Sequence, residues 1–182
     1  MTTVDRVLRR WRESKVRPYL HAGAHVLDIG CGDGSLFRQF RGLFATGVGI
    51  DPALEHSVKE STYRLIPGAF PENLQDDAAF NVISLLAVLE HIPRSHQPRF
   101  AQSIADRLTK RGHLIVTVPS PRVDAILDVL RRLRLIHGMA LEQHYGFPAD
   151  RTPQVFAAAG LKLVRWHRFQ LGFNNLFVFQ KP

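Results

Sequence analysis

The chain has 182 residues, 45% of them apolar and 22% charged, which is typical of one folded domain with a substantial core. It contains no apolar run near the roughly 18 residues of a membrane span and no apolar leader segment, so we expect a cytoplasmic protein without a transmembrane segment. The net charge of +8 raises nucleic acid as a partner, but most basic residues are dispersed along the chain, which disfavours it.

The first predicted element is a helix within residues 1–20. Val4, Leu8 and Trp11 recur at helical spacing with basic residues between them, and Pro18 ends the pattern. Two interpretations stay open. The helix either covers a ligand site or packs on the domain with a solvated basic face.

A short apolar run then leads into a turn with three glycines in five residues, Gly30, Gly32 and Gly34, followed by a helical pattern. Glycine lets the backbone adopt positive φ and lets a ligand approach closely, while the N–H groups of the new helix favour an anion. Asp28 precedes the turn and suits an ammonium group. The spacing differs from the dinucleotide fingerprint G-x-G-x-x-G, so we infer a ligand with an amino group and a carboxylate.

The segment Asp-Ile-Gly-Cys-Gly-Asp-Gly at residues 28–34 resembles the first motif of class I S-adenosylmethionine-dependent methyltransferases. The resemblance implies one α/β domain over 1–182. Its fold would be a doubly wound, mostly parallel seven-stranded Rossmann-like sheet with an antiparallel C-terminal hairpin. It also implies S-adenosyl-L-methionine as the cofactor and S-adenosyl-L-homocysteine as the product. The cofactor-binding candidates are Asp28, Gly30, Cys31, Gly32, Asp51, Pro52, Phe70 and Leu86.

Two of these candidates follow the second and third predicted strands, at residues 45–50 and 63–66. Asp51 stands about twenty residues past the glycine turn, where an acid can accept both ribose hydroxyls. The family commonly has an aspartate near Ala69 that binds the adenine amino group, and this chain has none. Phe70 is the expected substitute, through its ring or its backbone N–H. Cys31 is the single cysteine, and its place inside the turn favours a small filler over a nucleophile.

The fourth predicted strand, residues 80–86, ends in the turn 87–93, which matches the family's glutamate–histidine turn. His91 lies on the rim where donor and acceptor would meet. It is interpreted either as a base for an acceptor hydroxyl or as a histidine that braces the turn.

An amphipathic helix over 97–109 and a fifth strand over 112–119 follow. The stretch 121–147 is predicted to be a lid insert, with membrane contact and plain scaffold as alternatives, and it ends with His144 and Tyr145, two further catalytic candidates. A last helix, 152–159, precedes two strands at 161–166 and 176–180 that we expect to pair.

The resemblance implies methyl transfer to a small-molecule acceptor, with oxygen as the favoured atom and lipid-linked or glycan-related acceptors among the options. No metal-ligand cluster is visible in the sequence. Two alternatives remain, an RNA methyltransferase and a non-catalytic cofactor-binding module. The oligomeric state is left open.

Overall fold

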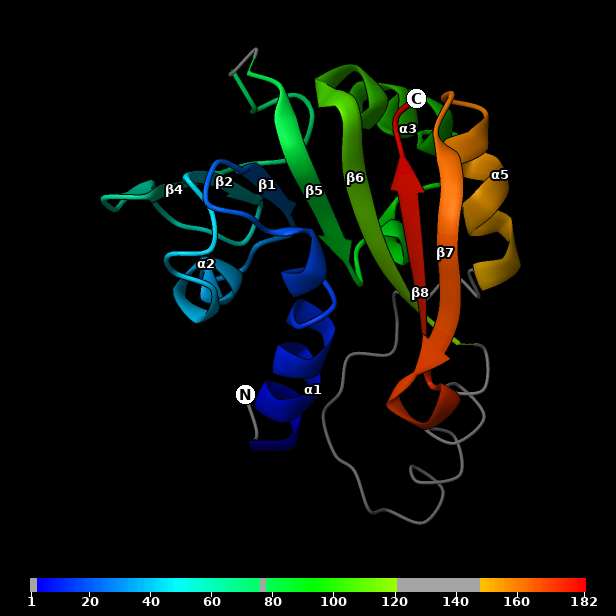
Figure 1. Ribbon diagram of the computed structural model, residues 1–182, viewed down its shortest axis with the longest axis horizontal. Helices are drawn as coiled ribbons and strands as arrows, with labels where there is room; N and C mark the ends of the chain where they lie inside the picture. The colour runs from blue at the N-terminus through cyan, green and yellow to red at the C-terminus, as the bar shows by residue number, and fades with distance from the viewer. Residues whose placement is uncertain (1–2, 76–77, 121–147) are drawn as a thin grey trace.

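The computed structural model describes residues 3–75, 78–120 and 148–182, shown in colour in Figure 1. The α-helices are α1 (Thr3–Glu13), α2 (Ser35–Gln39), α3 (Gln97–Arg107) and α5 (Thr152–Ala157). Short 3-10 helices are η1 (Arg17–Tyr19), η2 (Leu89–His91), η3 (Ala149–Arg151) and η4 (Gln170–Gly172). The strands are β1 (His25–Ile29), β2 (Thr46–Asp51), β3 (Val58–Lys59), β4 (Tyr63–Pro67), β5 (Phe80–Leu86), β6 (Leu108–Pro119), β7 (Lys162–Phe169) and β8 (Asn174–Gln180).

All the described strands belong to one sheet with the order β3-β4-β2-β1-β5-β6-β8-β7. Strands β4, β2, β1, β5 and β6 run parallel, and β8 enters antiparallel between β6 and β7. The predicted fold is confirmed, with one addition. The two-residue strand β3 pairs antiparallel with β4 at the edge, so the described sheet has eight strands instead of seven.

The chain reverses its direction of travel across the sheet at β1. From β1 it proceeds through β2 to β4 on one side, and it then returns to β5 and β6 on the other. In such sheets a crevice opens beyond the carboxyl ends of the two strands at the reversal. The crevice here lies beyond β1 and β5, which is where the glycine turn and the glutamate–histidine turn both begin.

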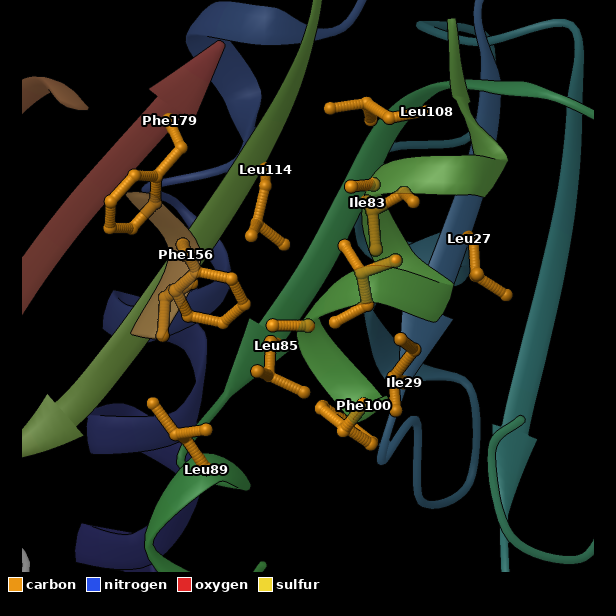
Figure 2. Packing of buried hydrophobic residues seen from close by; sticks show 14 of the residues in the cluster. Leu27, Ile29, Ile83, Leu85, Leu89, Phe100, Leu108, Leu114, Phe156 and Phe179 are labelled. Carbon is orange, nitrogen blue, oxygen red and sulfur yellow. The ribbon is translucent and has the colours of Figure 1, made fainter. Parts of the chain in front are cut away.

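Side chains that alternate along the strands form two apolar cores, one on each face of the sheet. On one face, Leu27 of β1 and Leu85 of β5 belong to the same core as Phe100 of α3 and Phe156 of α5, as Figure 2 shows. On the other face, a second core joins the sheet to α2 through Phe37. Helices therefore cover both faces, as a doubly wound sheet requires.

Glycines in β2 let the glycine turn and α2 pack closely on the sheet. A Cβ at Gly47 would lie 2.5 Å from the Phe37 ring, and one at Gly49 would lie 2.7 Å from Cys31 Sγ. Larger residues at either position would push these groups away. Cys31 therefore fills the space above Gly49, in agreement with the small-filler interpretation.

Several boundaries differ from the sequence-based expectations. The first helix ends at Glu13, not near residue 20, and a turn and η1 follow it before β1. The strand predicted fifth is β6, which begins at Leu108 and so includes the last residues of the predicted helix 97–109. Strand β7 extends to Phe169, beyond the predicted end at residue 166. The predicted lid insert 121–147 lies outside the described residues. No described helix is long and apolar enough to cross a membrane.

Candidate functional site

The glycine turn after β1 depends on backbone conformations that suit glycine. Gly30, Gly32 and Gly34 have φ values of +77°, +53° and +76°. A Cβ at Gly30 would also overlap Val88 Cγ2, in the turn that follows β5. The two turns at the crevice therefore fit against each other only because residue 30 has no side chain.

Asp51, at the end of β2, holds the glycine turn in place. Its Oδ2 accepts a hydrogen bond from the Gly32 N–H at 2.8 Å, and its Oδ1 accepts one from the Ala53 N–H at 2.8 Å. A carboxylate oxygen has a second lone pair, so both oxygens can still accept a hydroxyl proton. Pro52 follows as an exposed residue.

The first helix lies across the glycine turn and is held there by charged side chains. The Arg9 guanidinium donates to Glu13 Oε1 at 3.0 Å and also pairs with Asp33, inside the turn. Ser35, the first residue of α2, donates its hydroxyl proton to the same Glu13 oxygen. In Figure 1, α1 lies at the end of the sheet toward which the β5 arrow points.

Between α1 and the glycine turn lies a cavity of about 200 Å³. It is lined by Arg9, Arg12, Glu13, Asp28, Gly30, Cys31, Gly32 and Leu86. Five of these eight residues are cofactor-binding candidates from the sequence, so the fold brings them to one place. The lining carries two guanidinium groups and two carboxyl groups, a pattern that complements a ligand with charges of both signs.

Asp28 is buried at the bottom of this site. Ser84 donates a hydrogen bond to its Oδ1 at 2.7 Å. Burial raises the pKa of Asp28 to about 7, and the Ser84 hydrogen bond opposes this increase. Burial also raises the pKa of the Cys31 thiol, so the thiol stays protonated and is a poor nucleophile.

The residues fit the methionyl end of S-adenosylmethionine, which carries an ammonium and a carboxylate. Glu13 is 5% exposed, and its Oε2 has no hydrogen-bond partner among the described residues. A buried carboxylate oxygen without a partner is costly, and an ammonium donor would relieve that cost. Arg12 borders the same cavity and can bind a carboxylate.

The turn after β5 combines a buried acid with an exposed histidine. Glu90 is 3% exposed, and its Oε2 has no hydrogen-bond partner among the described residues. Burial raises the pKa of Glu90 to about 7, while the nearby Arg12 charge offsets part of the increase. His91 is exposed, and its backbone N–H donates to the Val88 carbonyl at 2.9 Å. His91 does not border the 200 Å³ cavity.

The Phe70 ring lies away from the cavity, in the apolar core. It meets the Phe100 ring edge-on at a centroid distance of 5.4 Å, and the Arg107 guanidinium lies 5.5 Å from its centroid. A ring engaged in this way is poorly placed to stack on an adenine. The geometry therefore disfavours the expected ring stacking, and the backbone N–H of Phe70 is the part that remains a candidate.

Two catalytic candidates, His144 and Tyr145, lie outside the described residues. In the part of the chain that the structure describes, no group of three His, Cys, Asp or Glu residues could hold a metal ion.

Sequence reasoning missed the three cavity residues that α1 contributes, Arg9, Arg12 and Glu13. The available signal was the option that the first helix covers a ligand. The pattern did not show which of its charged residues would face the site, because a charged stripe ordinarily faces solvent.

Comparisons with known proteins agree with this geometry. The family model described as a methyltransferase domain matches residues 2–165. The ubiquinone biosynthesis O-methyltransferase of Glaesserella parasuis is 26% identical over 157 residues, covering 79% of this chain and 63% of that protein. The tRNA U34 carboxymethyltransferase of Colwellia psychrerythraea is 33% identical over 105 residues, covering 52% of this chain and 32% of that protein. The chain thus spans less than two thirds of the length of either relative.

Solved structures share the fold. One is a chain of the complex between the Haloferax volcanii Trm112 methyltransferase activator and a methyltransferase, with a TM-score of 0.73 and 15% identity. The match covers 96% of this chain and 91% of that chain. At this level of identity the likeness concerns the fold alone.

Proposed function

This chain belongs to the methyltransferase domain family, whose cofactor is S-adenosylmethionine, and we propose that it methylates an oxygen atom of a small-molecule acceptor. The cofactor supplies a methyl group that its sulfonium charge already activates. The protein's own contribution is then to hold the reactants in line and to exclude water, which can lower a barrier by about 7–11 kcal/mol.

The cavity of mixed charge supports the cofactor-binding part of this proposal. Asp28 and Glu13 bind the ammonium group, while Arg12 binds the carboxylate. Asp51 accepts the ribose hydroxyls through the lone pairs that Gly32 and Ala53 leave unused. Each group acts from a position that the fold already holds, which reduces the cost of ordering the site on binding.

His91 takes the acceptor proton in this proposal. Its turn begins at the carboxyl end of β5 and touches Gly30 through Val88, so it borders the crevice without lining the cofactor cavity. A neutral imidazole accepting a hydroxyl proton contributes a factor on the order of 100 or more.

Two observations favour a small acceptor over RNA. Helix α1 lies over the glycine turn, so it narrows the access of a large acceptor to the crevice from that side. The O-methyltransferase relative also matches a larger share of this chain than the tRNA-modifying one does. RNA remains the second candidate because of the net charge of +8 and the name of that second relative.

The test measures methyl transfer to a panel of phenolic and carboxylic small molecules and to unmodified tRNA. We expect turnover with a small molecule that persists at high salt. On that acceptor, His91→Ala should lower kcat about 100-fold with cofactor affinity nearly unchanged, and the wild-type rate should fall in acid as the imidazole takes up a proton.

His21→Ala, which changes an exposed histidine before β1, is the matched control and should keep full kcat. His144→Ala shows whether the other candidate histidine is the base instead. Turnover with tRNA alone would contradict the small-molecule proposal, and full kcat in the His91 variant would remove His91 from the chemistry.

A further inference from the structure

Helix α1 is oriented opposite to an ordinary surface helix. Its charged residues Arg9, Arg12 and Glu13 face the glycine turn and the cavity. Its apolar residues face outward, with exposed fractions of 58% for Val7, 37% for Leu8 and 42% for Trp11. A surface helix normally buries its apolar stripe. In α1, the ionic contacts of the charged face hold that face inward and leave the apolar stripe exposed.

A fourth exposed apolar residue lies beside this stripe. Leu171, in η4, is 89% exposed and has a φ of +57°, a conformation that costs a leucine about 1 kcal/mol or more. The neighbouring Gln170 donates its side-chain amide proton to the Leu8 carbonyl at 2.8 Å, and Trp11 meets Phe169 edge-on at 6.4 Å. We define the outer apolar patch as Val7, Leu8, Trp11 and Leu171.

The charges around the outer apolar patch are mainly basic. Arg6 and Arg10 are exposed on α1, and Lys15 follows that helix with its Nζ 4.8 Å from the Phe169 ring centroid. Three acids lie nearby. Asp5 is half-buried in the first turn of α1, Glu13 is buried, and Asp33 is paired with Arg9 and Arg38.

We propose that the outer apolar patch docks on an anionic phospholipid surface. Aliphatic and tryptophan side chains enter the boundary between headgroups and acyl chains, and flanking arginines attract anionic headgroups. A second copy of the chain fits less well, because two basic rims would then face each other. Docking would also place the cofactor cavity, on the inner side of α1, next to the lipid surface.

The test is sedimentation of the full chain with vesicles of phosphatidylglycerol and phosphatidylcholine in equal parts. We expect binding that weakens with added salt and is much weaker on phosphatidylcholine alone. The double variant Val7→Gln/Leu171→Asn should reduce binding about tenfold or more, since asparagine tolerates positive φ at residue 171. Arg10→Gln should reduce binding about fivefold on anionic vesicles only.

Val58→Gln is the matched control, because Val58 is 36% exposed on β3, at the opposite edge of the sheet from β7. It should bind like the wild type. In a Trp166→Phe background, Trp11 is the remaining tryptophan, and its fluorescence should shift to the blue on anionic vesicles. Melting temperatures confirm that each variant folds.

Either of two results would overturn the proposal. One is failure of the wild type to bind anionic vesicles at low salt. The other is binding that the double variant retains in full. A concentration-dependent dimer that the double variant abolishes, without vesicle binding, would assign the patch to contacts between copies. These measurements do not use activity, so they are independent of the proposed acceptor.

Discussion

The glycine turn after β1 and the glutamate–histidine turn after β5 stand side by side at the crevice, yet they are built differently. In the glycine turn, the backbone is fixed by Asp51, and Arg9 and Arg38 hold the exposed Asp33. In the second turn, Glu90 is buried, its Oε2 has no partner among the described residues, and the His91 side chain is exposed. The first turn presents a preformed backbone, whereas the second presents side chains that can exchange protons.

In the proposed function, the two turns have different roles. Binding requires a surface that does not rearrange, which the hydrogen-bonded turn provides. Proton transfer requires a side chain that reaches the acceptor, and we propose His91 of the second turn for this step. The contact between Gly30 and Val88 joins the two turns, so changes there should disturb both functions.

Gly30→Ala should have the largest effect. The new Cβ would overlap Val88 and would sit at a φ of +77°, so we expect a loss of about 3 kcal/mol or more in the free energy of unfolding. Denaturant unfolding measures the loss. Gly42→Ala is the control, since its φ is +85° but no atom lies within 4 Å of the added Cβ, and it should lose about 1 kcal/mol. Equal losses would show that the contact with Val88 is unimportant.

Asp51→Ala should affect the glycine turn and leave the second turn intact. We expect cofactor affinity to fall by about 1–3 kcal/mol, because the ribose hydroxyls and the Gly32 N–H lose a charged acceptor. Calorimetric titration with S-adenosylhomocysteine measures this loss. Glu55→Ala, which removes an exposed acid nearby in the chain, should bind normally. An unchanged dissociation constant in the Asp51 variant would remove Asp51 from the site.

Asp28→Asn should have an effect on stability that depends on pH. The folded-state pKa of Asp28, about 7, lies above its ordinary value of 3.8, so its contribution to stability is lost as pH rises from that ordinary value through about 7. Between about pH 5 and pH 8 the variant should lose less stability than the wild type, by about 1–3 kcal/mol, and Glu90 should contribute to the slope that remains. Denaturant unfolding at several pH values measures both slopes, and equal slopes would contradict a buried, protonated Asp28.

Cofactor affinity should change with pH in the opposite direction to the stability of the fold. An ionised Asp28 attracts the ammonium group, so wild-type affinity should increase from about pH 6 to pH 8, and Asp28→Asn should reduce that increase. Titrations at the two pH values check this. Identical pH dependence in both proteins would show that Asp28 does not bind the ammonium group.

Local sequence patterns were enough to locate the main strands, the glycine turn and the place of Asp51. These features follow from local rules: apolar runs between turn residues, glycine where φ is positive, and an acid at the end of the second strand. Gly30, Gly32 and Gly34 do adopt positive φ, and β5 begins and ends where the apolar pattern does.

Contacts between distant segments determine which face of α1 points inward, how Glu13 and Glu90 are buried, and why the Phe70 ring belongs to the core. Examples are Arg9 with Asp33 and Gln170 with the Leu8 carbonyl. The helical pattern identified an amphipathic helix correctly. It could not show that ionic contacts at the glycine turn would hold the charged face inside and leave the apolar face exposed, because the pattern records spacing and not partners.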